Sequence, residues 1–388
     1  MLDNFQNCPT HEHKTVTGFT PHCDVPSVSF NYQLLFYCST VLLFYCFTVL
    51  LFYCPLFTVH WLLYMQDTFG RTIDYLRISV TEACNFRCIY CAPNGHTTPS
   101  TTPLSVDDIH RVVRAAVALG ITKIRLTGGE PLLRRDIVKI VRAISSVDGV
   151  QDLALTTNAF LLGRLAHELV DAGLKRVNIS LDTLRRDRFT EIVGVDAFDA
   201  VWSGIRAAED AGLAPLKINV VAMRGVNDDE CADFARLTIE HPWHVRFIEL
   251  MPVGASDVAR DFFDQHFIPA SELIARLPEL AKTESPQGSG PARTYRLPGA
   301  QATLGFITPA SEHFCNACNR LRVTAHGSLC ACLFGERGED VRGALCEGVS
   351  ETKLQELLTR AIESKPEQHP FGDDFKITSV DAMSKIGG

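Results

Sequence analysis

Residues 75–91, YLRISVTEACNFRCIYC, join a short apolar run to three closely spaced cysteines. The run at residues 75–80 is rich in branched apolar side chains and predicts a β-strand. Cys84, Cys88 and Cys91 follow on the loop that leaves this strand. Three thiolates at this spacing can hold three irons of a [4Fe–4S] cluster and leave the fourth iron open to a small molecule. The alternative is a structural zinc site, which needs a fourth ligand, and His96 is the nearest candidate.

Downstream of this loop, short apolar runs alternate with longer amphipathic stretches. Repeated strand-then-helix units give parallel strands with right-handed crossovers. We therefore predict an α/β fold, a partial (β/α)6 barrel of the TIM type, with its chemistry at the carboxyl ends of the strands. Ser105 and Asp108 form a capping box for the first helix. The predicted strands are residues 75–80, 123–127, 152–157, 176–180, 216–221 and 245–248, and the predicted helices are 106–119, 137–146, 161–172, 198–211 and 230–239.

The first 64 residues differ from the rest of the chain. No Asp, Glu, Lys or Arg occurs from residue 25 to residue 66, and LLFYC begins three successive copies of one unit at residues 34, 42 and 50. Three hypotheses fit: a translated upstream repeat before a start at Met65, a membrane anchor, or a targeting segment. Basic flanking residues, which the last two would carry, are missing, so we favour the first. We predict that residues 1–64 are not part of the fold and that Cys38, Cys46 and Cys54, which recur with the repeat, bind no metal.

Composition limits the class of protein. The chain has 388 residues, 46% of them hydrophobic and 21% charged, which is enough for one large core or two modest ones. The net charge of −8, without a block of like charges, argues against a nucleic-acid-binding face and gives no reason to expect a membrane partner. The 14 cysteines are clustered, which favours metal binding over a disulfide framework and indicates a reducing, cytoplasmic location.

A second group of three cysteines lies near the C-terminus, at Cys315, Cys318 and Cys332. This group predicts a second [4Fe–4S] cluster with one open iron. A four-thiol zinc site that includes Cys330 is the alternative. Only one residue separates Cys330 from Cys332, so the two side chains would point in opposite directions on an extended chain. We expect Cys231, Cys330 and Cys346 to be free thiols.

The first cysteine loop, with an aromatic residue before its last cysteine, resembles that of the radical S-adenosylmethionine (SAM) superfamily. The segment Gly128-Gly129-Glu130-Pro131, which follows the second predicted strand, resembles the segment that binds the methionine amino group in that superfamily. Further motifs indicate one family within this superfamily. From residue 65 to residue 388 the chain resembles the GTP 3′,8-cyclase family of molybdenum cofactor biosynthesis. These motifs are residues 74–80, 126–132, 155–158, 178–182 and 246–249, and a final Gly387-Gly388.

This resemblance implies two [4Fe–4S] clusters and SAM as cofactors. The implied activity is that of a lyase that converts GTP to (8S)-3′,8-cyclo-7,8-dihydroguanosine 5′-triphosphate, through a 5′-deoxyadenosyl radical that takes the 3′ hydrogen. Implied partners are an electron donor and a downstream cyclic pyranopterin monophosphate synthase. A homodimer is one option for the oligomeric state. One alternative is another two-cluster radical SAM enzyme that acts on a peptide or a different small molecule. A membrane-anchored zinc-binding interaction protein is the third hypothesis.

The resemblance also assigns roles to single residues of this chain, wherever they match a family motif. Arg320 and Arg322 join the cysteines of the first loop as catalytic candidates, and the chain divides into a core barrel at 65–290 and a cluster-bearing, substrate-binding region at 291–388. Cationic side chains on barrel strands are costly unless an anion pairs with them, which fits a triphosphate. The resemblance places Cys84, Cys88 and Cys91 on the first cluster, Cys315, Cys318 and Cys332 on the second, Tyr90, Gly129, Glu130, Ser180 and Met251 on SAM, and Arg77, Arg125, Thr156, Lys217, Arg320, Leu321 and Arg322 on GTP.

Overall fold

The computed structural model describes residues 65–92, 102–252, 257–284, 290–335 and 338–369. All of them belong to the compact unit Leu62–Gly388. The repeat-bearing leader, His96 and the final Gly387-Gly388 lie outside the described residues, so the predictions made for them stay predictions. Within the described ranges, no helix has the length and apolar character that crossing a membrane requires.

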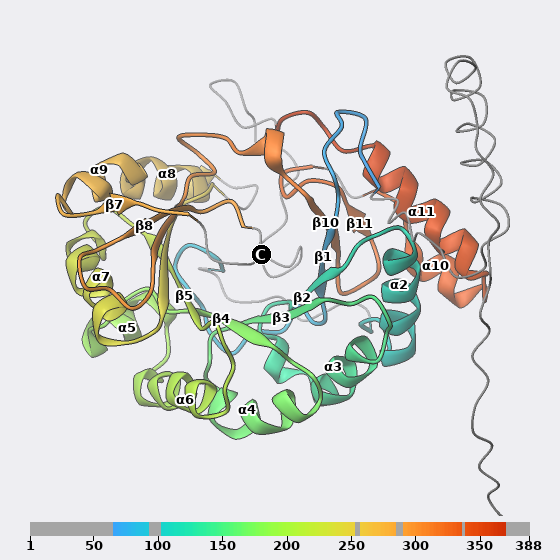
Figure 1. The fold of residues 1–388 in the computed structure, drawn as a ribbon, viewed down its shortest axis with the longest axis horizontal. Helices are drawn as coiled ribbons and strands as arrows, with labels where there is room; N and C mark the ends of the chain where they lie inside the picture. Colours follow the sequence, from blue (N-terminus) through green and yellow to red (C-terminus); the bar gives the residue numbers. More distant parts are fainter. Residues whose placement is uncertain (1–64, 93–101, 253–256, 285–289, 336–337, 370–388) are drawn as a thin grey trace, which may run out of the picture. The chain divides into compact units, whose positions relative to one another are not determined.

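Six parallel strands form the centre of the fold and neighbour one another in chain order. Figure 1 shows them curling around an interior, with the helices packed on the outside. The predicted strands and helices are confirmed to within one residue at each end, and Ser105 and Asp108 form the expected capping box. The strands are β1 (Tyr75–Ser79), β2 (Lys123–Thr127), β3 (Asp152–Thr157), β4 (Arg176–Ser180), β5 (Lys217–Ala222) and β6 (His244–Glu249); the helices are α2 (Val106–Ala118), α3 (Ile137–Ser145), α4 (Leu162–Asp171), α6 (Phe198–Asp210) and α7 (Cys231–Glu240).

C-terminal strands that the sequence did not predict extend the sheet at both edges. β10 (Arg320–Val323) pairs in parallel with β1, and β9 (Leu304–Ile307) pairs in parallel with β6. The result is an 11-stranded sheet in the order β11-β10-β1-β2-β3-β4-β5-β6-β9-β8-β7. The remaining elements are α5 (Arg186–Val193), α8 (Asp257–His266), α9 (Ala270–Ala275), α10 (Val341–Cys346), α11 (Glu351–Glu363), β7 (Ala281–Lys282), β8 (Arg293–Arg296), β11 (Leu329–Cys330) and the 3₁₀ turns η1 (Pro131–Leu133), η2 (Asp228–Glu230) and η3 (Cys315–Ala317).

The strands separate an outer apolar core from a polar interior. Successive side chains of a strand point to opposite faces of a sheet. On β1, Leu76 and Ile78 belong to the buried hydrophobic core, whereas Tyr75 and Arg77 line the interior cavity. On β5, Ile218 and Val220 belong to the core, whereas Lys217, Asn219 and Val221, which alternate with them, line the cavity. The core therefore lies between the sheet and its helices, and the inner face is left for polar side chains.

Candidate active site

A cavity of about 330 Å³ lies on the inner face of the barrel. Its lining brings together nearly every site residue that the sequence predicted. Leu321 is the exception, because β10 turns its side chain into the hydrophobic core while its two neighbours face the cavity. The predicted residues that line the cavity are Arg77, Cys84, Cys88, Tyr90, Cys91, Arg125, Gly129, Glu130, Thr156, Ser180, Lys217, Met251, Cys315, Cys318, Arg320, Arg322 and Cys332.

The first thiol group, Cys84, Cys88 and Cys91, lies on the loop after β1. Burial raises the pKa of Cys88 well above its usual value, and repulsion by Asp182 and by the other two thiolates adds to the shift. Two backbone hydrogen bonds join this loop to the end of α5: Arg87 N–H donates to the Val193 carbonyl at 2.9 Å, and Ile89 N–H donates to the Ile192 carbonyl at 3.0 Å. The loop is therefore fixed by a helix that the sequence did not predict.

A glycine lets this loop approach the end of β2. A Cβ atom on Gly129 would lie 2.4 Å from the Ala83 carbonyl oxygen and 2.6 Å from that of Glu82. Such contacts are too short for any larger residue. Gly129 N–H donates to the Thr81 carbonyl at 2.8 Å, and Glu130 N–H donates to the Ala83 carbonyl at 2.7 Å. The segment 128–131 thus packs directly on the cysteine loop.

The second thiol group, Cys315, Cys318 and Cys332, lines another part of the same cavity. Burial opposes the thiolate of Cys318, but Arg320 and Lys365 outweigh it and lower the pKa of Cys318 to about 6. A thiol that ionises this readily is suited to bind metal. Burial raises the pKa of Cys315, and repulsion by the two other thiolates of this group adds to it.

Cys330 does not share the cavity of the second thiol group. It is 2% exposed on β11 and, unlike Cys332, is not among the residues that line the cavity. Among the described residues, no group of three His, Cys, Asp or Glu side chains is arranged to hold a single metal ion. Each thiol group offers three thiols to the cavity, which is the number that a [4Fe–4S] cluster with one open iron takes from a protein.

Three arginines lie in register on adjacent strands. Arg77 on β1 is paired with Arg322 on β10 at one side and with Arg125 on β2 at the other. Burial lowers the pKa of Arg77 well below its usual value, with repulsion by Arg322 as the next cause. Burial and repulsion by Arg320 lower the pKa of Arg322 to about 10. Burial also lowers the pKa of Arg125, whose guanidinium lies 5.4 Å from the centre of the Tyr75 ring.

The cationic lining continues on β5 and β6. Burial lowers the pKa of Lys217 to about 6, and repulsion by Arg246, Arg176 and Arg125 adds to the shift. Burial, followed by repulsion from Arg125, lowers the pKa of Arg246 to about 9. So many buried positive charges in one cavity are unfavourable without an anion to pair with them. The cavity is therefore built for a ligand with several negative charges.

Three neutral polar side chains beside these cations have atoms without a hydrogen-bond partner in the described part of the chain. Thr156 Oγ1, both side-chain polar atoms of Asn178 and Asn219 Oδ1 are buried and have no hydrogen-bond partner among the described residues. All three side chains line the cavity, and Thr156 and Asn178 are register neighbours on β3 and β4. Buried polar groups are nearly always hydrogen-bonded in a folded protein. These atoms therefore mark where a polar ligand would bind.

Two buried carboxylates stand on the side of the cavity nearest the first thiol group. Glu130 accepts hydrogen bonds from Leu132 N–H at 2.9 Å, Thr157 Oγ1 at 2.8 Å and Asn158 N–H at 2.7 Å, and burial raises its pKa to about 7. Asp182 accepts from the Tyr90 hydroxyl at 2.8 Å and from Val221 N–H at 2.8 Å. Burial raises the pKa of Asp182 to about 6. Tyr90 thus connects the cysteine loop to the end of β4.

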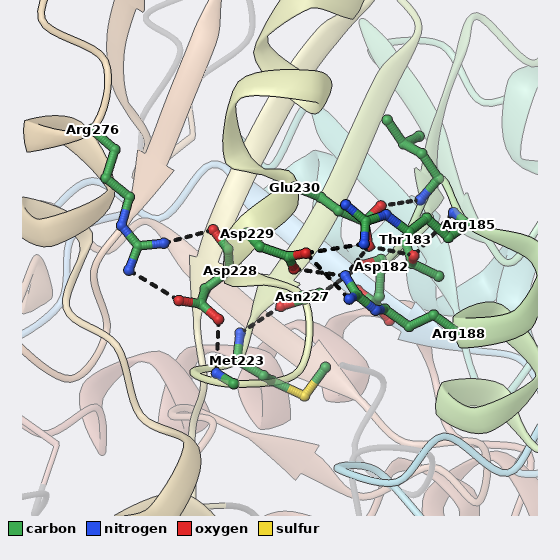
Figure 2. A network of polar contacts seen from close by, with 12 residues as sticks. Asp182, Thr183, Arg185, Arg188, Met223, Asn227, Asp228, Asp229, Glu230 and Arg276 are labelled. Carbon is green, nitrogen blue, oxygen red and sulfur yellow. Dashed lines mark hydrogen bonds and ion pairs between the residues drawn. The ribbon is translucent and has the colours of Figure 1, made fainter.

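A polar network behind the cavity holds Asp182 in place (Figure 2). Asn227 Nδ2 donates to the Asp182 carbonyl at 2.7 Å and to the Val221 carbonyl at 2.9 Å. The fully buried Glu230 accepts from the Thr183 hydroxyl at 2.6 Å and pairs with Arg188 at 2.5 Å. These contacts join the loop after β4 to the loop after β5. The backbone of Asp182 is therefore held by Asn227, and the next residue, Thr183, is held by Glu230.

Comparison with known proteins agrees with this geometry. Residues 78–238 match the family model described as "Radical SAM superfamily", and residues 243–371 match the model "Molybdenum Cofactor Synthesis C". The GTP 3′,8-cyclase of Pelotomaculum thermopropionicum is 47% identical over 330 residues, which cover 84% of this chain and 100% of the relative. The enzyme of the same name from Moorella thermoacetica is 46% identical over 333 residues, again 84% of this chain and 100% of the relative.

The chain belongs to the GTP 3′,8-cyclase family, within the radical SAM superfamily. Membership implies a [4Fe–4S] cluster and SAM as cofactors. Among solved structures, SuiB from Streptococcus suis is similar in fold, with a TM-score of 0.50 at 15% sequence identity. The match covers 71% of this chain and 65% of SuiB.

Sequence reasoning gave no role to some residues of the cavity. On β4, Asn178 and Arg176 line it two and four residues before the predicted Ser180, and on β5 Asn219 lies two residues after the predicted Lys217, so strand alternation could have indicated them. Arg176 pairs with Asp152, with 2.8 Å from Nε to Oδ1, and its Nη1 is buried with no partner in the described part of the chain. Lys365 lies beyond the end of α11 and carries no sequence signal.

Proposed function

We propose that the protein converts GTP to (8S)-3′,8-cyclo-7,8-dihydroguanosine 5′-triphosphate, the first step of molybdenum cofactor biosynthesis. The observation that carries this proposal is the joint presence of two three-thiol groups and a buried cationic lining in one cavity. The thiols suit a radical SAM enzyme with two clusters, and the cations suit a triphosphate. Another radical SAM reaction would explain the first thiol group but not so many buried cations.

The triphosphate would bind the inner faces of the strands. The whole chain carries a net charge of −8, yet this cavity holds the buried Arg125, Lys217 and Arg322 and the half-buried Arg77. A guanidinium binds two phosphate oxygens at once through its planar donors, and a lysine adds a point charge. Thr156 offers a hydroxyl to the same ligand, and Arg320 and Arg322 would bring the nucleoside close to the second thiol group.

SAM would bind beside the first thiol group, in contact with Tyr90, Gly129, Glu130, Ser180 and Met251. Cys84, Cys88 and Cys91 would hold a [4Fe–4S] cluster that supplies the electron for cleavage of SAM to methionine and a 5′-deoxyadenosyl radical. Glu130 already accepts three hydrogen bonds, and a carboxylate has about four acceptor sites, so one site is left for the SAM ammonium group.

The reaction balances with two electrons. The first electron cleaves SAM, and the radical takes the 3′ hydrogen of GTP and becomes 5′-deoxyadenosine. The C3′ radical then forms a bond to C8 of guanine and leaves one unpaired electron on the ring. A second electron and one proton complete the dihydro product. Cys315, Cys318 and Cys332 would hold a second cluster next to the substrate.

An electron donor and an enzyme that consumes the product complete the proposal. We propose a cytoplasmic location and a cyclic pyranopterin monophosphate synthase as the next enzyme. We also propose a boundary between residues 290 and 291, which separates the core barrel from the C-terminal cluster-bearing region.

A nucleotide-dependence experiment tests this function. The purified chain, reconstituted without oxygen, is mixed with SAM, a strong reductant and one nucleotide at a time, and the products are followed by mass spectrometry. We expect a cyclised nucleotide and rapid release of 5′-deoxyadenosine with GTP. With ATP we expect no cyclised nucleotide and only the slow release of 5′-deoxyadenosine that requires the first cluster alone. Equal release of 5′-deoxyadenosine without GTP would leave the radical chemistry standing but would refute the substrate.

A further inference from the structure

Two buried cations, Arg71 and Lys365, contact the backbone of all three segments that carry the second thiol group. We infer that these two residues form a clamp that positions Cys315, Cys318 and Cys332 for the second [4Fe–4S] cluster. This inference rests on the proposed function, which supplies that cluster. Both would be positioning residues, because their hydrogen bonds go to the backbone of the thiol-bearing segments.

Lys365 joins two of the three segments. It follows α11, and only 4% of it is exposed. Its ammonium donates to the Arg320 carbonyl at 2.9 Å and to the Ala331 carbonyl at 2.6 Å. Arg320 comes two residues after Cys318, and Ala331 directly precedes Cys332. One buried charge therefore joins the segments of two thiols that are 14 residues apart in sequence, in addition to the antiparallel pairing of β10 with β11.

Arg71 holds the third segment and Lys365 itself. Its Nη1 donates to the Cys315 carbonyl and to the Glu367 carbonyl, both at 2.8 Å, and its Nη2 donates to the Pro366 carbonyl at 2.7 Å. Its Nε pairs with Asp67 at 2.5 Å. Since Pro366 and Glu367 directly follow Lys365, the two cations fix each other's position through the chain.

Local structure around these thiols explains why a clamp is needed. Cys315 begins the short turn η3, Cys318 follows it, and Cys332 follows the two-residue strand β11. The pairing of β10 with β11 relates Cys318 to Cys332, but within the described ranges no α-helix or strand contains any of the three cysteines. The distances among the thiols therefore depend on contacts outside regular structure, and three carbonyl contacts of the clamp go to the thiol-bearing segments. Its two other carbonyl contacts join Arg71 to the residues that follow Lys365.

The test isolates the second cluster in the full chain. A parent variant with Cys84→Ala, Cys88→Ala and Cys91→Ala keeps only the second thiol group, so its iron content, about four per chain, reports that group alone. Lys365→Met and Arg71→Met are then introduced separately. Arg111→Met is the matched control, because Arg111 also donates to a backbone carbonyl, that of Val349 at 2.6 Å, but contacts no thiol-bearing segment.

We expect Lys365→Met and Arg71→Met each to lower iron and sulfide per chain by at least about half, with the circular dichroism of the metal-free chain unchanged. Cluster that remains in Lys365→Met should have a more negative reduction potential than in the parent, because a neighbouring positive charge is gone. Arg111→Met should change neither quantity.

Three results would overturn the inference, and they differ from one another. Full iron content with an unchanged potential in both variants would show that the clamp does not position the cluster. Loss of helical signal in metal-free Lys365→Met would show that its contacts hold the fold rather than the thiols. Absence of iron from the parent variant would refute the second cluster, and the proposed function would then lose that cofactor too.

Discussion

Lys217→Met should weaken GTP binding about tenfold or more and, in the same protein, raise the free energy of unfolding. The loss of affinity follows because a hydrogen bond to a charged group contributes about 1.5–3 kcal/mol. The gain in stability follows because Lys217 is 1% exposed and surrounded by other cations, so the empty protein holds this side chain at a cost. Methionine has a similar length and carries no charge.

The pH dependence of this effect has a definite sign. Folding lowers the pKa of Lys217 from 10.5 to about 6, so the folded state binds fewer protons than the unfolded state between those values. The contribution of Lys217 to the free energy of unfolding therefore increases as the pH rises from about 6 to 10.5. Near pH 7.5 the unmodified protein is destabilised by up to about 4 kcal/mol relative to a chain without this charge. Part of the rise in stability from pH 7 to pH 9 should disappear in Lys217→Met.

Isothermal titration with GTP and urea unfolding at the two pH values measure both effects. Lys353→Met is the matched control, since Lys353 is an exposed residue of α11 that pairs with Glu356 at 2.8 Å. Its substitution should change the free energy of unfolding by less than about 0.5 kcal/mol and leave GTP affinity unaltered. A Lys217→Met protein that is less stable and binds GTP normally would contradict a phosphate-binding role for this lysine.

Substitution of single cysteines should separate the two clusters. Cys88→Ala should remove about four irons per chain and abolish 5′-deoxyadenosine, because the first thiol group has no spare ligand. Cys332→Ala should remove a similar amount of iron but leave the slow cleavage of SAM that requires only the first cluster. Iron analysis and mass spectrometry of the reconstituted proteins provide both measurements.

Cys330→Ala is the control for this pair of variants. Cys330 is buried on β11, two residues before Cys332, and lies outside the cavity lining. Metal content and 5′-deoxyadenosine release should match the unmodified protein. A drop in metal content after this substitution would instead support a four-thiol site made with Cys315, Cys318 and Cys332.

The pattern of apolar residues along short stretches of sequence was enough to predict the barrel, but not the C-terminal strands that extend its sheet. The apolar runs of β2, β3 and β4 and the helical spacing of α2 each arise within about a dozen residues, so the sequence shows them directly. By contrast, α5 is rich in charged residues at Arg186–Val193 and has a weak apolar pattern. β10 was missed because it joins β1 across some 245 residues, and such pairing leaves no local signal.

The candidate site divides in the same way. The thiols of both groups and the arginines of β1, β2 and β10 could be predicted because their motifs keep fixed spacing. The resemblance places Leu321 on GTP together with Arg320 and Arg322, but β10 turns its side chain into the core. Arg71 and Lys365 could not be found, because each recognises backbone carbonyls, which every residue has, and only the folded chain shows which carbonyls they reach.

The most direct measurement uses GTP carrying deuterium at C3′, incubated with the reconstituted protein, SAM and a reductant, with the mass of the released 5′-deoxyadenosine determined. If the radical takes the 3′ hydrogen, the 5′-deoxyadenosine contains one deuterium and the cyclised nucleotide has lost it. Release of 5′-deoxyadenosine without deuterium, from a reaction that does contain labelled GTP, would contradict hydrogen abstraction at C3′ and with it the proposed cyclisation.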